Sequence, residues 1–371
     1  MTWSLDALAK RSVEVIESGQ GPGGGFLASP TFPNYRYSWF RDGSFIADAM
    51  SRAGRADSAE AFFGWCVDII ESRLGTITRL VSTAGADGPE SVAIGDHLHT
   101  RYTLDGRESD GEWWNFQLDG YGTWLWALGA HAGRYELGLE RFRLAIEATV
   151  EYLAAFWTQP SYDWWEENRH ERHVATLAAI WAGLTAAVTL DGVAPHIVEL
   201  AMTTAASIRG VVDGEGVSGG RLVKWLGGDD IDASLLASIT PFAMFPADGP
   251  VAKATIAEVE DRLTTGGVHR YPGDTFYGGG AWVLLAGFLG WSHLEAGDPE
   301  RASELARWMA DQADIDGHLP EQVPDPMLHP HRRAEWEDRW GPSARPLLWS
   351  HAMFLTLVVE AGVASKPVTR R

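Results

Sequence analysis

Among its 371 residues the chain has a single cysteine, Cys66, and it has no long apolar run. One cysteine cannot form an intramolecular disulfide, and chains without disulfides are typical of reducing compartments. The absence of 18 or more consecutive apolar residues argues against a membrane span. Residues 1–17 lack the basic segment and small-residue cleavage site of a signal peptide, and they are spaced like an amphipathic helix. These features together favour a cytoplasmic protein.

Positive charge and several well-known motifs are also scarce. With 30 basic and 50 acidic residues, the formal net charge is −20, which repels phosphate backbones and argues against a nucleic-acid partner. The glycines at 21–25 lack the lysine of a phosphate loop, residues 170–173 lack the H-E-x-x-H spacing, and no G-x-S-x-G occurs. Residues 229–232 lack EF-hand spacing, so we interpret them as a helix cap. No metal or cofactor site is predicted.

The chain also lacks a linker or a low-complexity tract, and it shows little convincing strand pattern. Apolar residues at i, i+3 and i+4, interrupted by breakers such as glycine, predict twelve helices instead. These helices are expected at 4–18, 43–53, 57–74, 119–132, 139–157, 171–190, 194–210, 230–239, 251–264, 279–296, 299–313 and 345–361. We therefore predict an all-α protein that forms a single domain over residues 1–371.

The segments between these helices alternate in character. Those before every even-numbered helix are long or rich in polar and aromatic residues, whereas the others are mostly short. Six helical hairpins with elaborate loops at one end are typical of an (α/α)6 barrel, with even helices inside. The runs 282–291 and 347–359 are apolar nearly all round, as inner helices must be. The elaborate loops would form a pocket at one mouth; a plain helical array is the alternative.

Tryptophan is abundant, and two of the 18 tryptophans directly precede a pair of acids. Indole rings fill protein cores, and their flat faces also suit the C–H faces of sugars. The stretch Asp163–Glu167 reads DWWEE and directly precedes a predicted helix. Apolar neighbours disfavour a charged carboxylate, which is how a general acid is kept protonated near neutral pH. Acids before a helix also serve as caps, so Glu166 has both interpretations.

Three further charged groups lie in loops at the same predicted mouth. Glu321 follows a proline before the last helix, and glycoside hydrolysis commonly needs one acid and one base across the scissile bond. A surface glutamate is the alternative for this residue. The pair Arg41–Asp42 follows Trp39, and it could grip vicinal sugar hydroxyls or form a structural ion pair. Arg270 begins a similar cluster with aromatic neighbours.

Five segments carry a more specific signal, because they follow one another in a recognisable order. They are Tyr35–Asp42 (YRYSWFRD), Gln117–Gly120 (QLDG), Asp163–Glu167 (DWWEE), Arg270–Asp274 (RYPGD) with Phe276 and Trp282, and Pro320–Gln322 with Trp349–Ser350. Together they resemble glycoside hydrolase family 15, the glucoamylase-like enzymes. The resemblance implies an (α/α)6 barrel and an inverting hydrolysis, with Glu166 as general acid and Glu321 as general base.

The same resemblance implies roles for the remaining site residues and no cofactor, because carboxylates and water suffice. Arg41 and Asp42 would hold the non-reducing glucose with help from Arg270, and Asp163 would assist the water. Aromatic residues would wall the pocket or lie near the reacting centre, namely Tyr35, Trp39, Trp165 and Trp282. The predicted substrate site also includes Trp113, Gln117, Asp119, Glu167 and Phe276.

The expected substrate is a short, soluble α-glucoside. The chain has no room for the large β-domain or the starch-binding module of longer family members, and it most resembles the isomaltose-hydrolysing ones. Isomaltose is therefore preferred over trehalose or malto-oligosaccharides, and the loops near 97–117 and 323–345 are expected to decide the linkage. Other classes that use this barrel stay open: an N-acylglucosamine epimerase-like isomerase, a glucoside phosphorylase or a non-catalytic sugar-binding protein. No oligomeric state is predicted.

Overall fold

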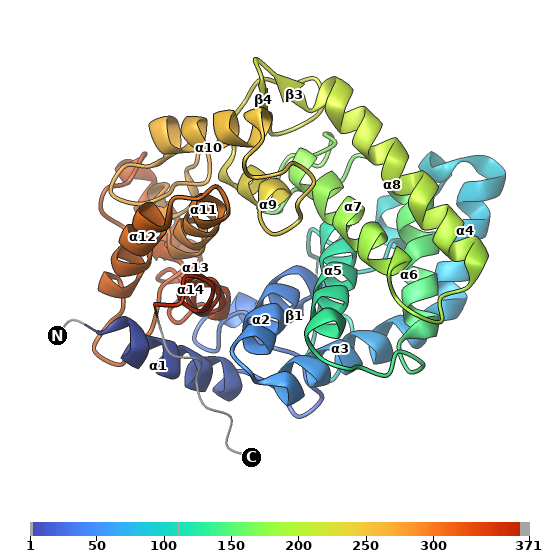
Figure 1. Ribbon diagram of the computed structural model, residues 1–371, viewed down its shortest axis with the longest axis horizontal. Coiled ribbons are helices and arrows are strands. Elements are labelled where there is room, and N and C mark those ends of the chain that lie inside the picture. The colour runs from blue at the N-terminus through green and yellow to red at the C-terminus, as the bar shows by residue number, and fades with distance from the viewer. Residues whose placement is uncertain (1–2, 110–111, 364–371) are drawn as a thin grey trace.

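Six helices of the computed structural model, which describes residues 3–109 and 112–363, form a closed inner ring (Figure 1). They are α2 (Phe40–Arg52), α5 (Asp119–Arg134), α7 (Val174–Val188), α9 (Leu236–Ile239), α11 (Val283–Glu295) and α14 (Leu348–Glu360). Each of these helices packs against the next, and α14 packs back against α2. The ring is thus made of the even-numbered helices that the sequence predicts.

Six more helices surround that ring (Figure 1). They are α1 (Leu5–Ser18), α3 (Ala56–Glu71), α6 (Arg143–Phe156), α8 (Pro195–Glu215), α10 (Pro250–Leu263) and α12 (Pro299–Asp311). All twelve predicted helices are present in the predicted inner and outer order, so the (α/α)6 barrel is confirmed. Among the described residues, no helix is both long enough and apolar enough to cross a membrane.

The inner helices approach one another closely and are apolar on most sides. Residues 283–292 of α11 are all buried, as the apolar run there predicts. At the contact of α5 with α7, a Cβ atom added to Gly183 would lie 2.3 Å from the Gly122 carbonyl oxygen. Because any larger side chain would push the two helices apart, glycine is required at this crossing.

One predicted helix is much shorter than expected. The pattern predicts a helix at 230–239, but the structure has the 3-10 turn η4 (Ala233–Leu235) followed by only four residues of α9. Asp232 caps this turn, since its side chain accepts the Ser234 N–H. The predicted cap is therefore present, and residues 230–232 are not helical.

The structure also contains two helices that the pattern did not predict, α4 (Leu74–Asp87) and α13 (Arg333–Trp340). The pattern predicts that the third helix ends near Gly75, whereas in the structure Gly75 is the second residue of α4. A helical glycine costs about 1 kcal/mol relative to alanine, and burial of Ile77 and Leu80 outweighs that cost. The α13 sequence, RAEWEDRW, is too polar to give the apolar spacing of a core helix.

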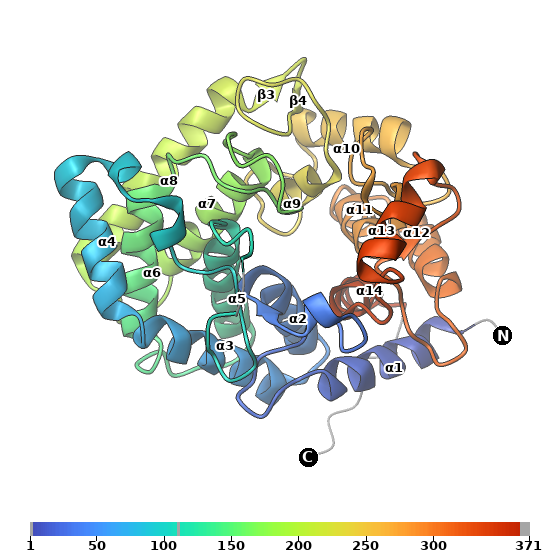
Figure 2. The same ribbon diagram turned by 180° about the vertical axis from the view of Figure 1, so that it is seen from behind.

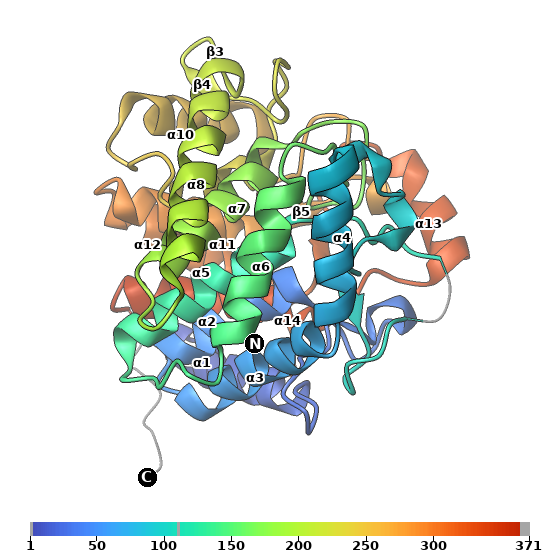
Figure 3. The same cartoon turned by 90° about the vertical axis from the view of Figure 1, so that its right-hand side faces the viewer.

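Three short strand pairs lie in the segments between the described helices. The antiparallel pairs are β1 (Ser38–Trp39) with β2 (Arg101–Tyr102), β3 (Val217–Ser218) with β4 (Arg221–Leu222), and β5 (Ala281–Trp282) with β6 (Gln322–Val323). The remaining 3-10 turns are η1 (Pro33–Tyr35), η2 (Pro89–Ser91), η3 (Ile94–Asp96), η5 (Phe276–Gly278) and η6 (Pro330–Arg332). Helix α13 packs on η5 and η6 at one end of the barrel, outside both rings (Figure 2, Figure 3).

Candidate active site

A cavity lies at the mouth of the barrel where the inner helices begin. Twelve of the fifteen predicted site residues line it, namely Tyr35, Trp39, Arg41, Asp42, Trp113, Trp165, Glu166, Glu167, Arg270, Phe276, Trp282 and Glu321. Trp39 directly precedes α2, and Trp282 directly precedes α11. Because the inner helices all begin at this end, residues far apart in the chain meet in one cavity.

Glu166 is held through one carboxylate oxygen. Its Oε1 accepts N–H groups from Trp39 Nε1, Trp113 Nε1 and Gln117 Nε2, each at 3.0 Å. Pairing of β1 with β2 sets this arrangement, because it lays the Arg101 guanidinium over the Trp113 ring, 3.4 Å from its centroid. An oxygen that already accepts three donors is a poor site for a proton. When Glu166 is protonated, its proton therefore resides on Oε2.

The two indoles that precede Glu166 in the sequence are not the ones that donate to its carboxylate. The Trp164 ring packs in the core against Phe45 and Trp349, with ring centroids 5.7 and 5.5 Å away. Trp165 donates its Nε1–H to Asp232. The Glu166 carboxyl instead meets the N–H edges of tryptophans from other segments. Glu166 has a φ of 65°, in the left-handed region, a backbone turn that the sequence does not reveal.

Glu321 is buried and is held through both oxygens. Tyr35 donates its hydroxyl to Oε1 at 2.8 Å, and Ser343 donates its hydroxyl to Oε2 at 3.0 Å. The pairing of β5 with β6, which directly follows Glu321, fixes this residue beside the start of α11. Burial raises the pKa of Glu321 to about 7, against the opposing effect of the two hydrogen bonds. Glu321 is thus a carboxyl that titrates near neutrality.

One aromatic pair links the two carboxylates. The rings of Tyr35 and Trp39 meet edge to face, with centroids 5.9 Å apart. Tyr35 donates to Glu321, and Trp39 donates to Glu166. Both acids line the same cavity, so a single small ligand can touch both at once.

The buried pair Arg41–Asp42 comes from the first turn of α2. Arg41 Nη1 donates to Gln117 Oε1 at 2.8 Å and to Asp119 Oδ2 at 3.0 Å, while its Nε lies 3.3 Å from Asp42 Oδ2. Burial raises the pKa of Asp42 to about 6, although Arg41 opposes this shift. Gln117 and Asp119 do not line the cavity. They orient Arg41, and Gln117 also holds Glu166.

A second cation, Arg270, lies against an aromatic wall. Its Nε donates to Asp274 Oδ2 at 2.8 Å, and its Nη2 lies 3.5 Å from Glu167 Oε1. The guanidinium also lies over the rings of Trp165 and Trp282, at 5.1 and 5.3 Å from their centroids. Burial raises the pKa of Glu167, and Arg270 lowers it. This wall therefore combines flat apolar faces with a fixed charge pair, as sugar binding requires.

Asp163 closes the turn that carries Glu166. Its Oδ1 accepts the backbone N–H groups of Trp165 and Glu167 at 2.9 and 2.8 Å, and its Oδ2 accepts from Asn168 Nδ2 at 3.2 Å. Asp163 does not line the cavity. Its assistance to a catalytic water stays a prediction, and the contacts described give it a structural part.

Other cavity residues were missing from the predicted site. They are Ala28, Trp114, Trp164, Trp336, Trp340, Leu347 and Trp349. Trp336 and Trp340 stand four residues apart on α13, a spacing that places both rings on one helix face. Their centroids lie 4.9 and 6.1 Å from the Phe276 ring, and Trp336 Nε1 donates to the Thr275 carbonyl. The W-x-x-x-W spacing is the sequence signal that could have identified Trp336 and Trp340 as site residues. Both loops expected to decide the linkage thus contribute to the cavity.

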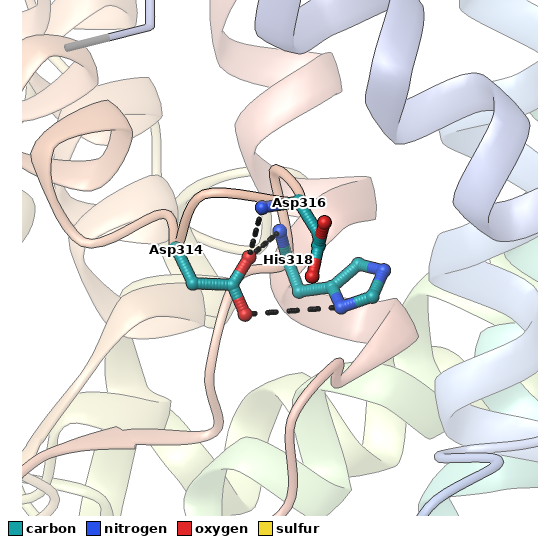
Figure 4. A group of neighbouring side chains, drawn as sticks. All are labelled: Asp314, Asp316 and His318. Carbon is teal, nitrogen blue, oxygen red and sulfur yellow. Dashed lines mark hydrogen bonds and ion pairs between the residues drawn. The ribbon is translucent and has the colours of Figure 1, made fainter. Parts of the chain in front are cut away.

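Asp314, Asp316 and His318 form the one group of potential metal ligands in the described part of the chain (Figure 4). Asp314 Oδ1 already accepts the backbone N–H groups of Asp316 and His318 at 3.0 and 2.9 Å. Arg11 donates to the Asp316 carbonyl at 2.8 Å, and Arg345 lies 3.8 Å from Asp314 Oδ2. Asp314 therefore closes a turn with these hydrogen bonds, and one guanidinium group lies near its carboxylate.

Comparison with known proteins places this geometry in a family. The model of glycosyl hydrolases family 15 matches residues 3–292. The chain belongs to that family. It is 48% identical over 363 residues to an isomaltose glucohydrolase of Kribbella flavida, covering 97% of this chain and 94% of that protein. A trehalase of Mycolicibacterium smegmatis is 28% identical, over 76% of this chain and 46% of that protein.

Solved structures agree with the family assignment. A glycosidase variant determined in complex with glucose superposes with a TM-score of 0.94 at 46% identity, covering 97% of this chain and 98% of that one. Membership of family 15 makes the chain a glycoside hydrolase. The epimerase-like isomerase and the non-catalytic sugar-binding protein are thereby set aside.

Proposed function

We propose that the chain is an inverting, exo-acting α-glucosidase that releases glucose from the non-reducing end of short α-glucosides, with isomaltose preferred. One observation carries the proposal. Glu166 and Glu321 line a single aromatic cavity and are linked through the neighbouring rings of Tyr35 and Trp39. Hydrolysis with inversion needs such a pair, one carboxyl to protonate the leaving oxygen and one to activate water.

Glu166 is assigned as the general acid. Its Oε1 is held by three N–H donors, so Oε2 delivers the proton to the glycosidic oxygen. As the bond between the anomeric carbon and that oxygen breaks, the leaving sugar departs as a neutral alcohol and Glu166 becomes a carboxylate. The same three donors then stabilise the new negative charge.

Glu321 is assigned as the general base. It would take a proton from a water molecule as that water attacks the anomeric carbon from the face opposite the leaving group. Each carboxylate oxygen accepts one hydroxyl hydrogen bond and has lone-pair capacity left for that water. A pKa of about 7 for Glu321 is well matched to a base working near neutral pH.

Exo action follows from the shape of the cavity. Trp164 and Trp349 line it and also pack against Phe45, which lies one turn further along α2 from Arg41. The cavity is therefore closed on the side of Arg41 and Asp42, and only a chain end can reach this charged pair. Vicinal hydroxyls of a terminal glucose suit the donors of Arg41 and the acceptors of Asp42.

The preference for isomaltose rests on the similarity to an isomaltose glucohydrolase and on the aromatic residues that α13 adds to the cavity. The chain is similar to the Kribbella flavida protein over nearly the full length of both, whereas the trehalase match covers less than half of that relative. Helix α13 adds Trp336 and Trp340 to the cavity, which gives a leaving sugar an aromatic surface.

Glucose release from isomaltose, maltose, trehalose and kojibiose, measured side by side, tests the proposal. We expect fastest turnover of isomaltose, with β-glucose as the first product when the reaction is followed by NMR. Dominant trehalose turnover would refute the preferred substrate, and initial α-glucose would refute inversion. Omission of phosphate should leave the rate unchanged, because water is the proposed nucleophile.

A further inference from the structure

A buried lysine lies directly behind the turn that carries the proposed acid. Lys224 Nζ is 2.9 Å from Asp232 Oδ2 and 3.6 Å from Asp163 Oδ2, and its side chain is only 6% exposed. It also lies 3.8 Å from the centroid of the Tyr271 ring. Burying an ammonium group is costly unless it is paired, and here two carboxylates pair with it. Lys224 does not line the cavity.

The turn in front of Lys224 is conformationally strained. Glu166 and Asn168 have φ angles of 65° and 50°, in the left-handed region that non-glycine residues rarely adopt. Such conformations persist only where the surroundings hold them. Asp163 holds this turn by accepting the backbone N–H groups of Trp165 and Glu167, and Lys224 neutralises that carboxylate from behind.

The second partner of Lys224 holds a wall of the cavity. Asp232 accepts the Trp165 Nε1–H on both oxygens, at 3.1 and 3.0 Å, and it also caps η4 by accepting the Ser234 N–H. Because Lys224 pairs with the same carboxylate, its charge fixes the acceptor that sets the tilt of the Trp165 indole. Trp165 in turn faces the cavity.

The third contact of Lys224, with the Tyr271 ring, connects it to Glu167. The Tyr271 ring lies against Lys224, and its hydroxyl donates to Glu167 Oε2 at 2.5 Å. Arg270 approaches the other oxygen of Glu167 at 3.5 Å. Glu167 follows the proposed acid in the chain. Glu167 also lines the cavity in which the proposed acid must present its proton to the glycosidic oxygen.

We propose that Lys224 is a positioning residue that fixes Trp165 and Glu167 against the leaving sugar through Asp163, Asp232 and Tyr271. The inference rests on the proposed function and adds to it a determinant of leaving-sugar recognition outside the cavity. It requires that loss of the ammonium group affects substrates with a leaving sugar more than substrates without one.

The test compares K224M with the parent chain on two substrates. The first is the disaccharide that the parent hydrolyses fastest, and the second is α-D-glucosyl fluoride, whose leaving group is a small ion. We expect kcat/KM on the disaccharide to fall on the order of 100-fold, with a large share of the loss in KM, because small misplacements at a site have effects of this size. Hydrolysis of the fluoride should stay near the parent value. The exposed Lys253 of α10 supplies the control K253M, which should change neither substrate.

A second variant separates positioning from simple charge balance. K224M leaves two buried carboxylates without their cation, so its melting temperature should fall. K224M/D232N removes one of those charges while keeping an acceptor for Trp165, so the melting temperature should partly recover. We expect the selective loss on the disaccharide to persist in this double variant.

Equal losses on both substrates, or restoration of disaccharide turnover by D232N, would overturn the positioning role of Lys224. A parent chain that hydrolyses none of the four disaccharides would overturn the proposed function itself. These two failures are distinguishable, because the first appears only in the variants and the second in the parent.

Discussion

Glu166 and Glu321 face the same cavity, but different chemical groups hold them. Glu166 lies on a strained turn and receives three N–H donors on one oxygen. Glu321 is only 2% exposed and receives one hydroxyl donor on each oxygen. An indole or amide N–H can only donate, whereas a hydroxyl can donate or accept. The surroundings of Glu166 therefore fix one proton position, and those of Glu321 adapt when a proton arrives.

This difference fits the two halves of an inverting reaction. A general acid must present its proton in one direction toward the glycosidic oxygen, which favours a carboxyl with one saturated oxygen. A general base must accept a proton without losing its place, which favours hydroxyl partners that can reorient. The two sites thus differ in the way that the proposed roles require.

The largest expected effect separates the roles of the two acids. Glu166→Gln should lower kcat on isomaltose about 1000-fold, because general acid catalysis contributes on this scale. Its effect on α-D-glucosyl fluoride should be much smaller, since fluoride departs without a full proton transfer. Glu321→Gln should impair both substrates, because both need an activated water. Steady-state kinetics on the two substrates makes the comparison, with exposed Glu304→Gln as control. Equal losses for both variants on both substrates would contradict the assignment.

A smaller effect is expected when one donor to Glu166 is removed. Trp113→Phe keeps an aromatic ring beneath Arg101 but deletes one of the three N–H groups on Oε1. Hydrogen bonds to charged groups contribute about 1.5–3 kcal/mol, so kcat on isomaltose should fall roughly 10- to 100-fold. The fluoride again serves as the comparison and should lose less. An unchanged kcat would show that Trp39 and Gln117 alone hold the acid.

The sequence could predict the barrel because each inner helix has its own local pattern. Runs such as residues 283–292 are apolar on every side, and glycines end several neighbouring segments. The local pattern does not predict helix α13, because its stabilising contacts come from residues that are distant in the chain. Trp336 packs on Phe276 and donates to the Thr275 carbonyl, about 60 residues away in the chain. Patterns read from one segment cannot reveal such contacts.

The candidate site likewise depends on contacts between segments that are distant in the chain. Motifs along the chain identify fifteen site residues, and twelve of these line the cavity. Donors that come from other segments were missed, since Ser343 and Lys224 have no motif of their own. The two indoles that donate to the Glu166 carboxylate, Trp39 and Trp113, also come from other segments, so its sequence neighbours do not identify them.

An effect of intermediate size is expected for a substitution in helix α13, on the side of the leaving sugar. Trp336→Ala removes an indole face from the cavity without touching either acid. KM for isomaltose should rise about tenfold, equivalent to roughly 1.4 kcal/mol of lost contact, while the fluoride keeps its KM. Glu335→Ala, on an exposed position of the same helix, is the matched control. A rise in KM for both substrates would instead place Trp336 against the terminal glucose.

The smallest expected effect concerns the pH profile of the base. Ser343 donates to Glu321 Oε2, and this hydrogen bond lowers the pKa of Glu321. Because the ionised form is the active one, kcat/KM should rise with pH through about 7 in the parent chain. Ser343→Ala removes the stabilising donor, so the pKa should rise and the acidic limb should move to higher pH by about one unit. Activity at pH 6 should therefore fall several-fold more than activity at pH 8, whereas Ser343→Thr should keep the parent profile. A limb that moves to lower pH would mean that Ser343 accepts a hydrogen bond from a protonated Glu321, which would reverse the roles assigned to the two carboxylates.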